Sequence, residues 1–244
     1  MFHIISDLNL NYTDHAEEQH LLPDHAKYII ITGNISNQSK RTLLYAERLA
    51  ATYANSNIIL NCGITESYKG EIDLIEEGFD IYLNKNKINN ENLYFPKGQI
   101  IGDYDFFCTI GWPDISSTAG FEDSYFSKYL YAAFDQSIYI DGILMSDRYP
   151  RFFDINEVRI RFEKEQQHVK TWLDTDQGKT KILITSLGNL SRQYLGKTTC
   201  KFFTSLNLSN VVWICGGDKE LINSKIITSP GRDRSKLIDL NVYL

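Results

Sequence analysis

The chain alternates short apolar runs with polar or glycine-containing turns, and this alternation constrains its fold more than any other feature. Residues 2–6, 28–32 and 57–60 each have the pattern of a buried β-strand that ends at such a turn. Residues 40–53 carry apolar side chains at helical spacing, with Ser39 as the expected N-cap. The order strand, loop, strand, helix, strand predicts an α/β domain with a largely parallel sheet.

The second half of the chain continues with short strands and one long helix. Residues 93–95, 99–101 and 105–110 are extended runs separated by proline and glycine turns, which predicts consecutive antiparallel strands. Residues 157–173 have the pattern of a helix. Further strands are predicted at 181–185, 211–215, 226–228 and 236–242. Since no repeat or linker interrupts this order, we predict a single domain over residues 1–244.

Composition narrows the classes of partner. The chain carries 25 Lys and Arg against 31 Asp and Glu, a formal net charge of −6. Such a balance gives no general attraction to nucleic acid or to an anionic membrane, so we expect neither as a partner. No run approaches the roughly 18 apolar residues of a membrane span, and the N-terminus lacks signal-peptide features. Four scattered cysteines are expected to be buried thiols in a reducing compartment, so we expect a cytoplasmic protein.

Polar loops follow the predicted strands, at the edge of the sheet where α/β proteins place their sites. The loops have the sequences SDLNL from position 6, TGNIS from 32, CGITE from 62, ITSL from 184 and WICGGDK from 213. Their order, spacing and flanks resemble the calcineurin-like metallophosphoesterases, whose motifs are SDLHL, GDI, GNHE, a THH-type strand end and WIHGHTH. Accessory segments extend this resemblance over nearly the whole chain.

The resemblance implies a fold and a chemistry. The fold would be α/β, a four-layer α/β/β/α sandwich in which two mixed sheets face each other with helices outside. In the family, the loops hold two metal ions that clamp a phosphate ester and activate a bound water. That chemistry needs carboxylate and imidazole ligands at the loop positions.

Carried over position by position, the family's ligands are mostly replaced in this chain. Asp7 is retained, and Asn34 stands where the family has its bridging aspartate. None of the five histidines follows His168, so the last two motifs contain no imidazole. The vestigial site consists of Asp7, Asn9, Asn34, Thr65, Ser186, Gly217 and Lys219. We therefore predict no catalytic residue, no metal and no cofactor.

Asp7 remains open to two interpretations. It is either a remnant metal ligand or a carboxylate that caps the strand end. A buried carboxylate is costly without a partner, so we expect Asp7 to pair with Lys219 across the vacated site. An ammonium group at Lys219 would also repel a divalent cation.

Three other clusters have alternative interpretations. His15, His20 and His25 lie among acidic residues. This segment is either a metal site or a polar connector in contact with solvent. The basic residues between 148 and 164 form either a phosphate-binding patch or a mixed-charge surface. The aromatic-rich segment 121–140 forms either an interface or a cover over the domain's own core.

These observations favour a catalytically inactive domain, a pseudoenzyme that binds or supports a protein partner or forms a homo-oligomer. An alternative is a weak or altered metal-dependent phosphoesterase with one metal on Asp7. A second alternative is an accessory subunit of a nucleic-acid-processing complex, which the net charge of −6 disfavours.

Overall fold

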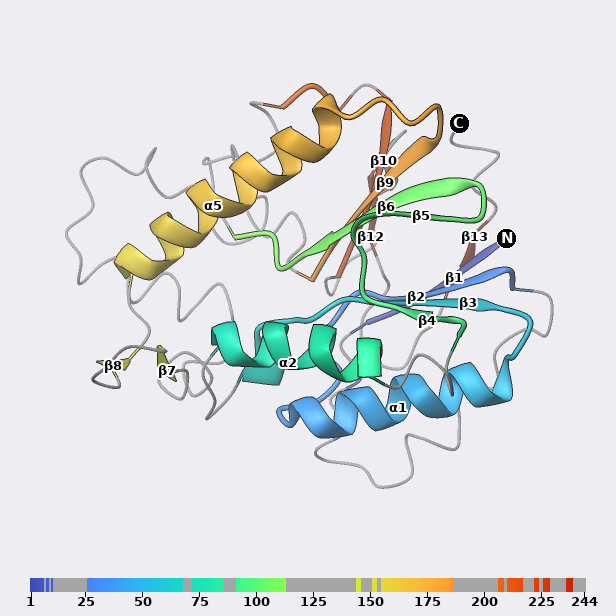
Figure 1. Ribbon diagram of the computed structural model, residues 1–244, viewed down its shortest axis with the longest axis horizontal. Coiled ribbons are helices and arrows are strands. Elements are labelled where there is room, and N and C mark those ends of the chain that lie inside the picture. Colours follow the sequence, from blue (N-terminus) through green and yellow to red (C-terminus); the bar gives the residue numbers. More distant parts are fainter. Residues whose placement is uncertain are drawn as a thin grey trace.

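Two mixed β-sheets and three α-helices make up most of the described structure (Figure 1). The computed structural model describes residues 1–6, 8, 10, 26–67, 72–85, 91–112, 144–145, 151–152, 155–186, 206–208, 210–216, 222–223, 226–228 and 236–238. A separate two-stranded hairpin joins β7 (Leu144–Met145) to β8 (Arg151–Phe152).

The first sheet has the order β13-β1-β2-β3-β4. Strands β1 to β4 pair in parallel, and β13 is antiparallel to β1. The bounds are β1 Phe2–Ile5, β2 Tyr28–Ile31, β3 Asn57–Leu60, β4 Leu93–Tyr94 and β13 Lys236–Ile238. The predicted strands at both ends of the chain are thus side by side in one sheet.

The second sheet has the order β11-β12-β10-β9-β6-β5. Strands β12, β10, β9 and β6 pair in parallel, and β11 and β5 are antiparallel edges. The bounds are β5 Lys97–Ile101, β6 Tyr104–Thr109, β9 Thr180–Thr185, β10 Val211–Cys215, β11 Ile222–Asn223 and β12 Ile226–Thr228.

One strand prediction needs correction. Residues 93–95 were expected to pair with the strands that follow them, but β4 pairs in parallel with β3 in the other sheet. Leu93 and Phe95 are buried in the core of the first sheet, and this burial decides which sheet β4 joins. The chain crosses at Pro96, whose carbonyl accepts a hydrogen bond from Cys108 N at 2.9 Å. The predicted antiparallel pairing of β5 with β6 is confirmed.

The helices are α1 (Ser39–Thr52), α2 (Ile72–Lys85) and α5 (Ile155–Asp174), with a 3-10 turn η1 at Thr65–Ser67. The sequence predicted α1 and α5 but not α2. Ser39 is not the N-cap of α1, because the helix begins at Ser39 and Gln38 precedes it as the cap. The nearby Ser36 Oγ accepts the bond from Gln38 N at 3.1 Å instead.

Strands β1 and β2 of the first sheet are buried on both faces, because their alternate side chains enter different cores. Tyr28 and Ile30 pack with Phe106 and other residues of the second sheet. Ile29 and Ile31 face the opposite way, into a cluster that includes residues of α1 and α2. Figure 1 shows α1 and α2 along the first sheet and α5 beside the second.

Asn61 connects the two sheets where their strands end. Its side-chain Nδ2 donates to Thr32 O at 3.1 Å and to Thr109 O at 2.8 Å. Thr32 follows β2 in the first sheet, whereas Thr109 ends β6 in the second. Asn61 is buried, so these bonds form away from water, where leaving the carbonyl groups unpaired would be costly. The amide therefore fixes the distance between the loops that follow the strands.

Three of the four cysteines, Cys62, Cys108 and Cys215, are buried free thiols, as predicted. Cys200 lies outside the described residues. Burial raises the pKa of the Cys108 thiol to about 12, which makes it a poor nucleophile. Among the helices that the structure describes, none is long and apolar enough to cross a membrane.

Candidate functional site

The loops after β2, β3, β9 and β10 meet at one end of the two sheets. A Cβ atom added to Gly33 would lie 2.7 Å from Gly63 N and 2.9 Å from Ser186 Cβ. A Cβ added to Gly216 would lie 3.2 Å from Thr32 Oγ1 and would also collide with the Ser186 carbonyl oxygen. Glycine permits these close approaches because it has no side chain. The predicted gathering of polar loops is therefore present in this part of the chain.

Asn34 and Thr65, two of the predicted site residues, are in contact. Asn34 Oδ1 accepts hydrogen bonds from Thr65 N and from Thr65 Oγ1, both at 3.3 Å. The Asn34 backbone has a φ of 58°, a left-handed conformation that asparagine tolerates better than most residues. Gly63 also packs against this side chain, where any Cβ would collide with Asn34 Oδ1. The Asn34 amide thus holds the loop after β3 against the loop after β2.

Glu66, the last residue of the CGITE motif, anchors the same two loops, although it was not among the predicted site residues. Its Oε1 accepts bonds from Ile35 N at 2.7 Å and Ser36 N at 3.3 Å. Its Oε2 accepts from Gly63 N at 2.8 Å and Asn34 N at 3.1 Å. Burial raises the pKa of the Glu66 carboxyl, and the bonds that its oxygens accept offset this only in part. Its carboxylate is therefore a structural acceptor for four backbone amides.

Ser186, a third predicted site residue, is buried beside these loops. Its Oγ donates to Ile110 O at 3.1 Å, which ties the end of β9 to the residue after β6. The remaining predicted residues, Asp7, Asn9, Gly217 and Lys219, lie outside the described residues. The proposed pair of Asp7 with Lys219 therefore stays a prediction. The histidine-rich segment and the aromatic segment 121–140 also fall outside the described ranges.

Within the described ranges, no three histidine, cysteine, aspartate or glutamate side chains are grouped so as to hold an ion. Asp7 lies outside these ranges. The expectation that the chain binds no metal or cofactor therefore stays a prediction.

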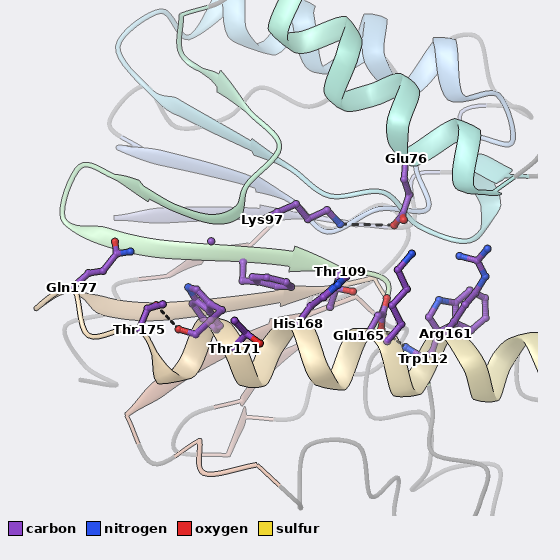
Figure 2. Close-up of a pocket in the computed structure, with 14 residues that line it drawn as sticks. Glu76, Lys97, Thr109, Trp112, Arg161, Glu165, His168, Thr171, Thr175 and Gln177 are labelled. Atoms are coloured by element: carbon purple, nitrogen blue, oxygen red, sulfur yellow. Dashed lines mark hydrogen bonds and ion pairs between the residues drawn. The ribbon is translucent and has the colours of Figure 1, made fainter.

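A second candidate site is a groove between α5, β5–β6 and α2, which we call the α5 groove (Figure 2). Its cavity volume is about 570 Å³, within the range of small-molecule pockets. The side chains that line it are Glu76, Lys97, Gly98, Phe107, Thr109, Trp112, Arg161, Lys164, Glu165, His168, Thr171, Trp172, Thr175 and Gln177.

Arg161 and Lys164 belong to the basic residues between 148 and 164, which were expected to form either a phosphate-binding patch or a mixed-charge surface. In the structure, Arg161 is buried and Lys164 is exposed, and both line the α5 groove. Of the other basic residues, Arg159 is exposed outside the groove lining and Arg148 lies outside the described residues. The signal that could have revealed the groove is the helical spacing of Arg161, Lys164 and His168, which places them along one side of α5.

Glu165 is a half-buried residue in the lining of the α5 groove, near Trp112 and Arg161 (Figure 2). Its Oε1 accepts from Ile110 N at 3.1 Å, and its Oε2 accepts from Gly111 N at 3.1 Å and Trp112 N at 3.0 Å. Burial raises the pKa of the Glu165 carboxyl to about 7, against an ordinary value of 4.5, although a bond from Thr109 and one from Trp112 N lower it. Glu165 therefore changes charge near neutral pH.

This shift predicts a pH dependence of stability. The raised pKa means that the folded protein holds a proton between pH 4.5 and about 7 that the unfolded chain releases. The stabilising contribution of Glu165 is full below about pH 4.5 and is lost as the pH rises through about 7. Glu165→Gln should remove this slope, so the difference in unfolding free energy between wild type and variant should fall with rising pH. Urea unfolding at several pH values measures it, and parallel profiles would contradict the prediction.

Comparisons with known proteins identify a shared fold but assign the chain to no family. No family model matches the chain, and no curated protein matches it. Among solved structures, it is similar to the crystal structure of phosphopantetheinyl hydrolase (PptH) from Mycobacterium tuberculosis. The TM-score is 0.62 at 12% sequence identity, over 93% of this chain and 86% of that chain. At this identity, the likeness shows a shared fold and carries no activity with it.

These comparisons contradict the assignment to the calcineurin-like metallophosphoesterases, and we correct it. The motifs that suggested this family are turns of a few residues at strand ends. Gly, Asn, Ser and Asp follow strands in many α/β proteins because their backbones and side chains suit tight turns. Their order along the chain reflects an arrangement of strands and loops, which is less specific than membership of one family. What the chain shares is the fold of the solved hydrolase.

Proposed function

We propose that this domain is a non-catalytic binding or structural module that contacts a protein partner or a second copy of itself. One observation carries the proposal. The described polar side chains at the strand ends form hydrogen bonds that hold the loops together, and these bonds occupy the groups that could otherwise contact a ligand. Glu66 accepts bonds from four backbone amides, Asn34 accepts from Thr65, and Ser186 donates to Ile110 O.

The two hydroxyl groups at this end illustrate the point. A serine or threonine becomes a nucleophile when a neighbouring base takes its proton. The Ser186 hydroxyl instead donates to a backbone carbonyl, and the Thr65 hydroxyl donates to Asn34 Oδ1 at 3.3 Å. Within the described ranges, neither hydroxyl is bonded to a histidine or lysine side chain. The Thr65 hydroxyl also lies 3.5 Å from Glu66 Oε2, but that oxygen already accepts from two backbone amides. This arrangement supports a structural role for both residues.

We also infer the finer architecture, a four-layer α/β/β/α sandwich. The two hydrophobic clusters support it, since one joins the facing sheets and the other joins the first sheet to α1 and α2. On the far side, Trp172 of α5 lies over Phe107 of β6 with ring centroids 5.4 Å apart. Two helices, two sheets and a helix in this order make four layers.

An activity assay tests the proposal. The purified chain is incubated with manganese or magnesium and two substrates, a phosphopantetheinyl carrier protein and a chromogenic aryl phosphate diester. The first substrate is chosen because the structural neighbour is a phosphopantetheinyl hydrolase. We expect no turnover above the buffer blank in either case.

Turnover would contradict the proposal and favour the alternative, a weak or altered metal-dependent phosphoesterase. A matched pair of variants would then locate the activity. Asp7→Ala removes the carboxylate at the strand end, whereas Asp174→Ala removes an exposed carboxylate at the end of α5. Loss of metal-dependent turnover in the first variant alone would assign it to Asp7. A light-scattering measurement of molar mass separates the homo-oligomer from a monomer that needs another protein.

A further inference from the structure

The α5 groove combines cationic side chains from two elements that are far apart in sequence. Lys97 comes from β5, and Arg161, Lys164 and His168 come from α5. Lys164 and His168 are exposed, and the Lys97 side chain is 43% exposed, so a solute can reach them. Figure 2 shows Arg161 directed into the space between α5 and α2, at the same end of the groove as Glu76.

Two acidic groups oppose these cations, and both are engaged. Glu76 of α2 lies 3.8 Å from Lys97 Nζ, a loose ion pair. The oxygens of Glu165 accept the three backbone amides of residues 110–112, and its raised pKa leaves it partly protonated near neutral pH. Among the described side chains that line the groove, Lys97, Arg161 and Lys164 carry three positive charges against these two carboxyl groups. This contrasts with the net charge of −6 on the whole chain.

The other end of the groove is neutral and polar. Thr171, Thr175 and Gln177 line it, and Figure 2 shows Gln177 and Thr175 far along α5 from Arg161. The Thr171 and Thr175 hydroxyls donate to backbone carbonyls of α5, and their oxygens accept from Gln167 Nε2 at 3.5 Å and from Lys181 Nζ at 3.3 Å. A hydroxyl oxygen has two lone pairs, so each can accept one further bond. At 1.5 Å per residue, α5 from Arg161 to its last residue, Asp174, extends about 20 Å. The groove is therefore long and differs in polarity between its two ends.

We propose that the α5 groove binds a small phosphate monoester with an extended hydroxyl-rich chain. The phosphate would sit among Lys97, Lys164 and Arg161, because a dianion with three accepting oxygens suits several charged donors at once. The chain would lie along α5 toward Thr171 and Thr175, which offer neutral acceptors to hydroxyl groups. This inference does not rest on the proposed function, because the groove residues are not those of the strand ends.

Isothermal titration calorimetry at low ionic strength tests the inference with three probes. Sorbitol 6-phosphate carries both parts of the proposed ligand, sorbitol lacks the phosphate, and inorganic phosphate lacks the chain. We expect sorbitol 6-phosphate to bind, inorganic phosphate to bind at least fivefold more weakly, and sorbitol to give no signal. Equal binding of phosphate and its ester would overturn the role of the neutral end. No binding of the ester, or equal binding of sorbitol, would overturn the site.

Two lysine variants on α5 form a matched pair. Lys164 lines the groove and Lys170 does not, yet both are exposed on the same helix, so neither change should disturb folding. Lys164→Ala should weaken binding of sorbitol 6-phosphate about tenfold or more, the loss expected for one charge-assisted hydrogen bond. Lys170→Ala should change it less than twofold. Equal losses in both variants would indicate diffuse attraction rather than a site, and an unchanged affinity in Lys164→Ala would also overturn the inference. Circular dichroism confirms that each variant is folded.

Discussion

Replacing Glu66 with alanine should cost about 4 kcal/mol or more of unfolding free energy, because the change leaves buried backbone amides unpaired. Four amides donate to the carboxylate, from Asn34, Ile35, Ser36 and Gly63. The Thr42 hydroxyl is a fifth donor, at 3.1 Å. A domain of this size has a total stability of about 5–15 kcal/mol, so the variant should be close to unfolding at room temperature.

Two further glutamate variants sharpen this prediction. Glu66→Gln keeps the shape of the side chain but turns one acceptor oxygen into a donor facing amide donors, so it should be destabilising but less so than alanine. Glu77→Ala removes an exposed carboxylate from α2 and should change stability by less than about 0.5 kcal/mol. Denaturant unfolding measures all three. A loss below about 1 kcal/mol for Glu66→Ala would show that water replaces the carboxylate at low cost.

Asp105→Ala should have a similarly large effect, about 3–5 kcal/mol, because it removes one partner of a buried ion pair. Asp105 of β6 is fully buried. Its Oδ2 accepts from Trp172 Nε1 at 2.8 Å and from Lys181 Nζ at 3.2 Å. Lys181 also donates to Trp172 O at 2.7 Å, near the last turn of α5. Loss of Asp105 would therefore leave a charge unpaired and loosen the end of α5 from the second sheet.

A double-mutant cycle separates the ion pair from general damage to the core. Lys181→Met keeps the length of the side chain and removes its charge. If the pair is coupled, the double variant Asp105→Ala/Lys181→Met should lose less stability than the sum of the two single losses. Asp105→Asn is the conservative variant, since its amide oxygen can still accept from the Trp172 indole. Strict additivity in the cycle would contradict the predicted coupling.

Glu66 and Asp105 are the two carboxylates that hold the candidate sites in position. Glu66 fixes the loops at the strand ends, and Asp105 fixes the helix that lines the α5 groove. Both are carboxylates whose oxygens are engaged within the protein. An acidic residue beside a cavity is easily mistaken for a catalytic group, but these contacts identify structural acceptors. Lys164 and His168, by contrast, are exposed side chains of α5 that line the groove.

Much of the secondary structure could be predicted from the sequence. Strands β3, β10 and β12 have the predicted bounds, and α1 is shifted by one residue from its prediction. Apolar periodicity is a local property, so it identifies an element without knowledge of the rest of the chain. The same local patterns placed Asn34, Thr65 and Ser186 in loops that would meet. In the structure, Asn34 and Thr65 are in contact and Ser186 lies beside Gly33.

The family assignment failed for a related reason. Each motif that carried it was a strand end followed by a turn, and such pieces recur wherever parallel strands end in polar loops. Their order describes an architecture, and the chain does share an architecture with a solved hydrolase. Membership of a family requires more sequence than these short segments contain.

What the sequence alone determined is therefore the α/β class, most of the strands, two of the helices and the gathering of polar loops. Only the tertiary structure decided that β4 joins the first sheet, that Glu66 is an anchor and that β5, α2 and α5 enclose a groove. The physical reason is the range of the interactions. A strand or helix is specified by neighbours a few residues apart, whereas Glu66 meets Thr42 across 24 residues and Asp105 meets Trp172 across 67. Burial and charge environment depend on such distant contacts, and the linear pattern does not contain them.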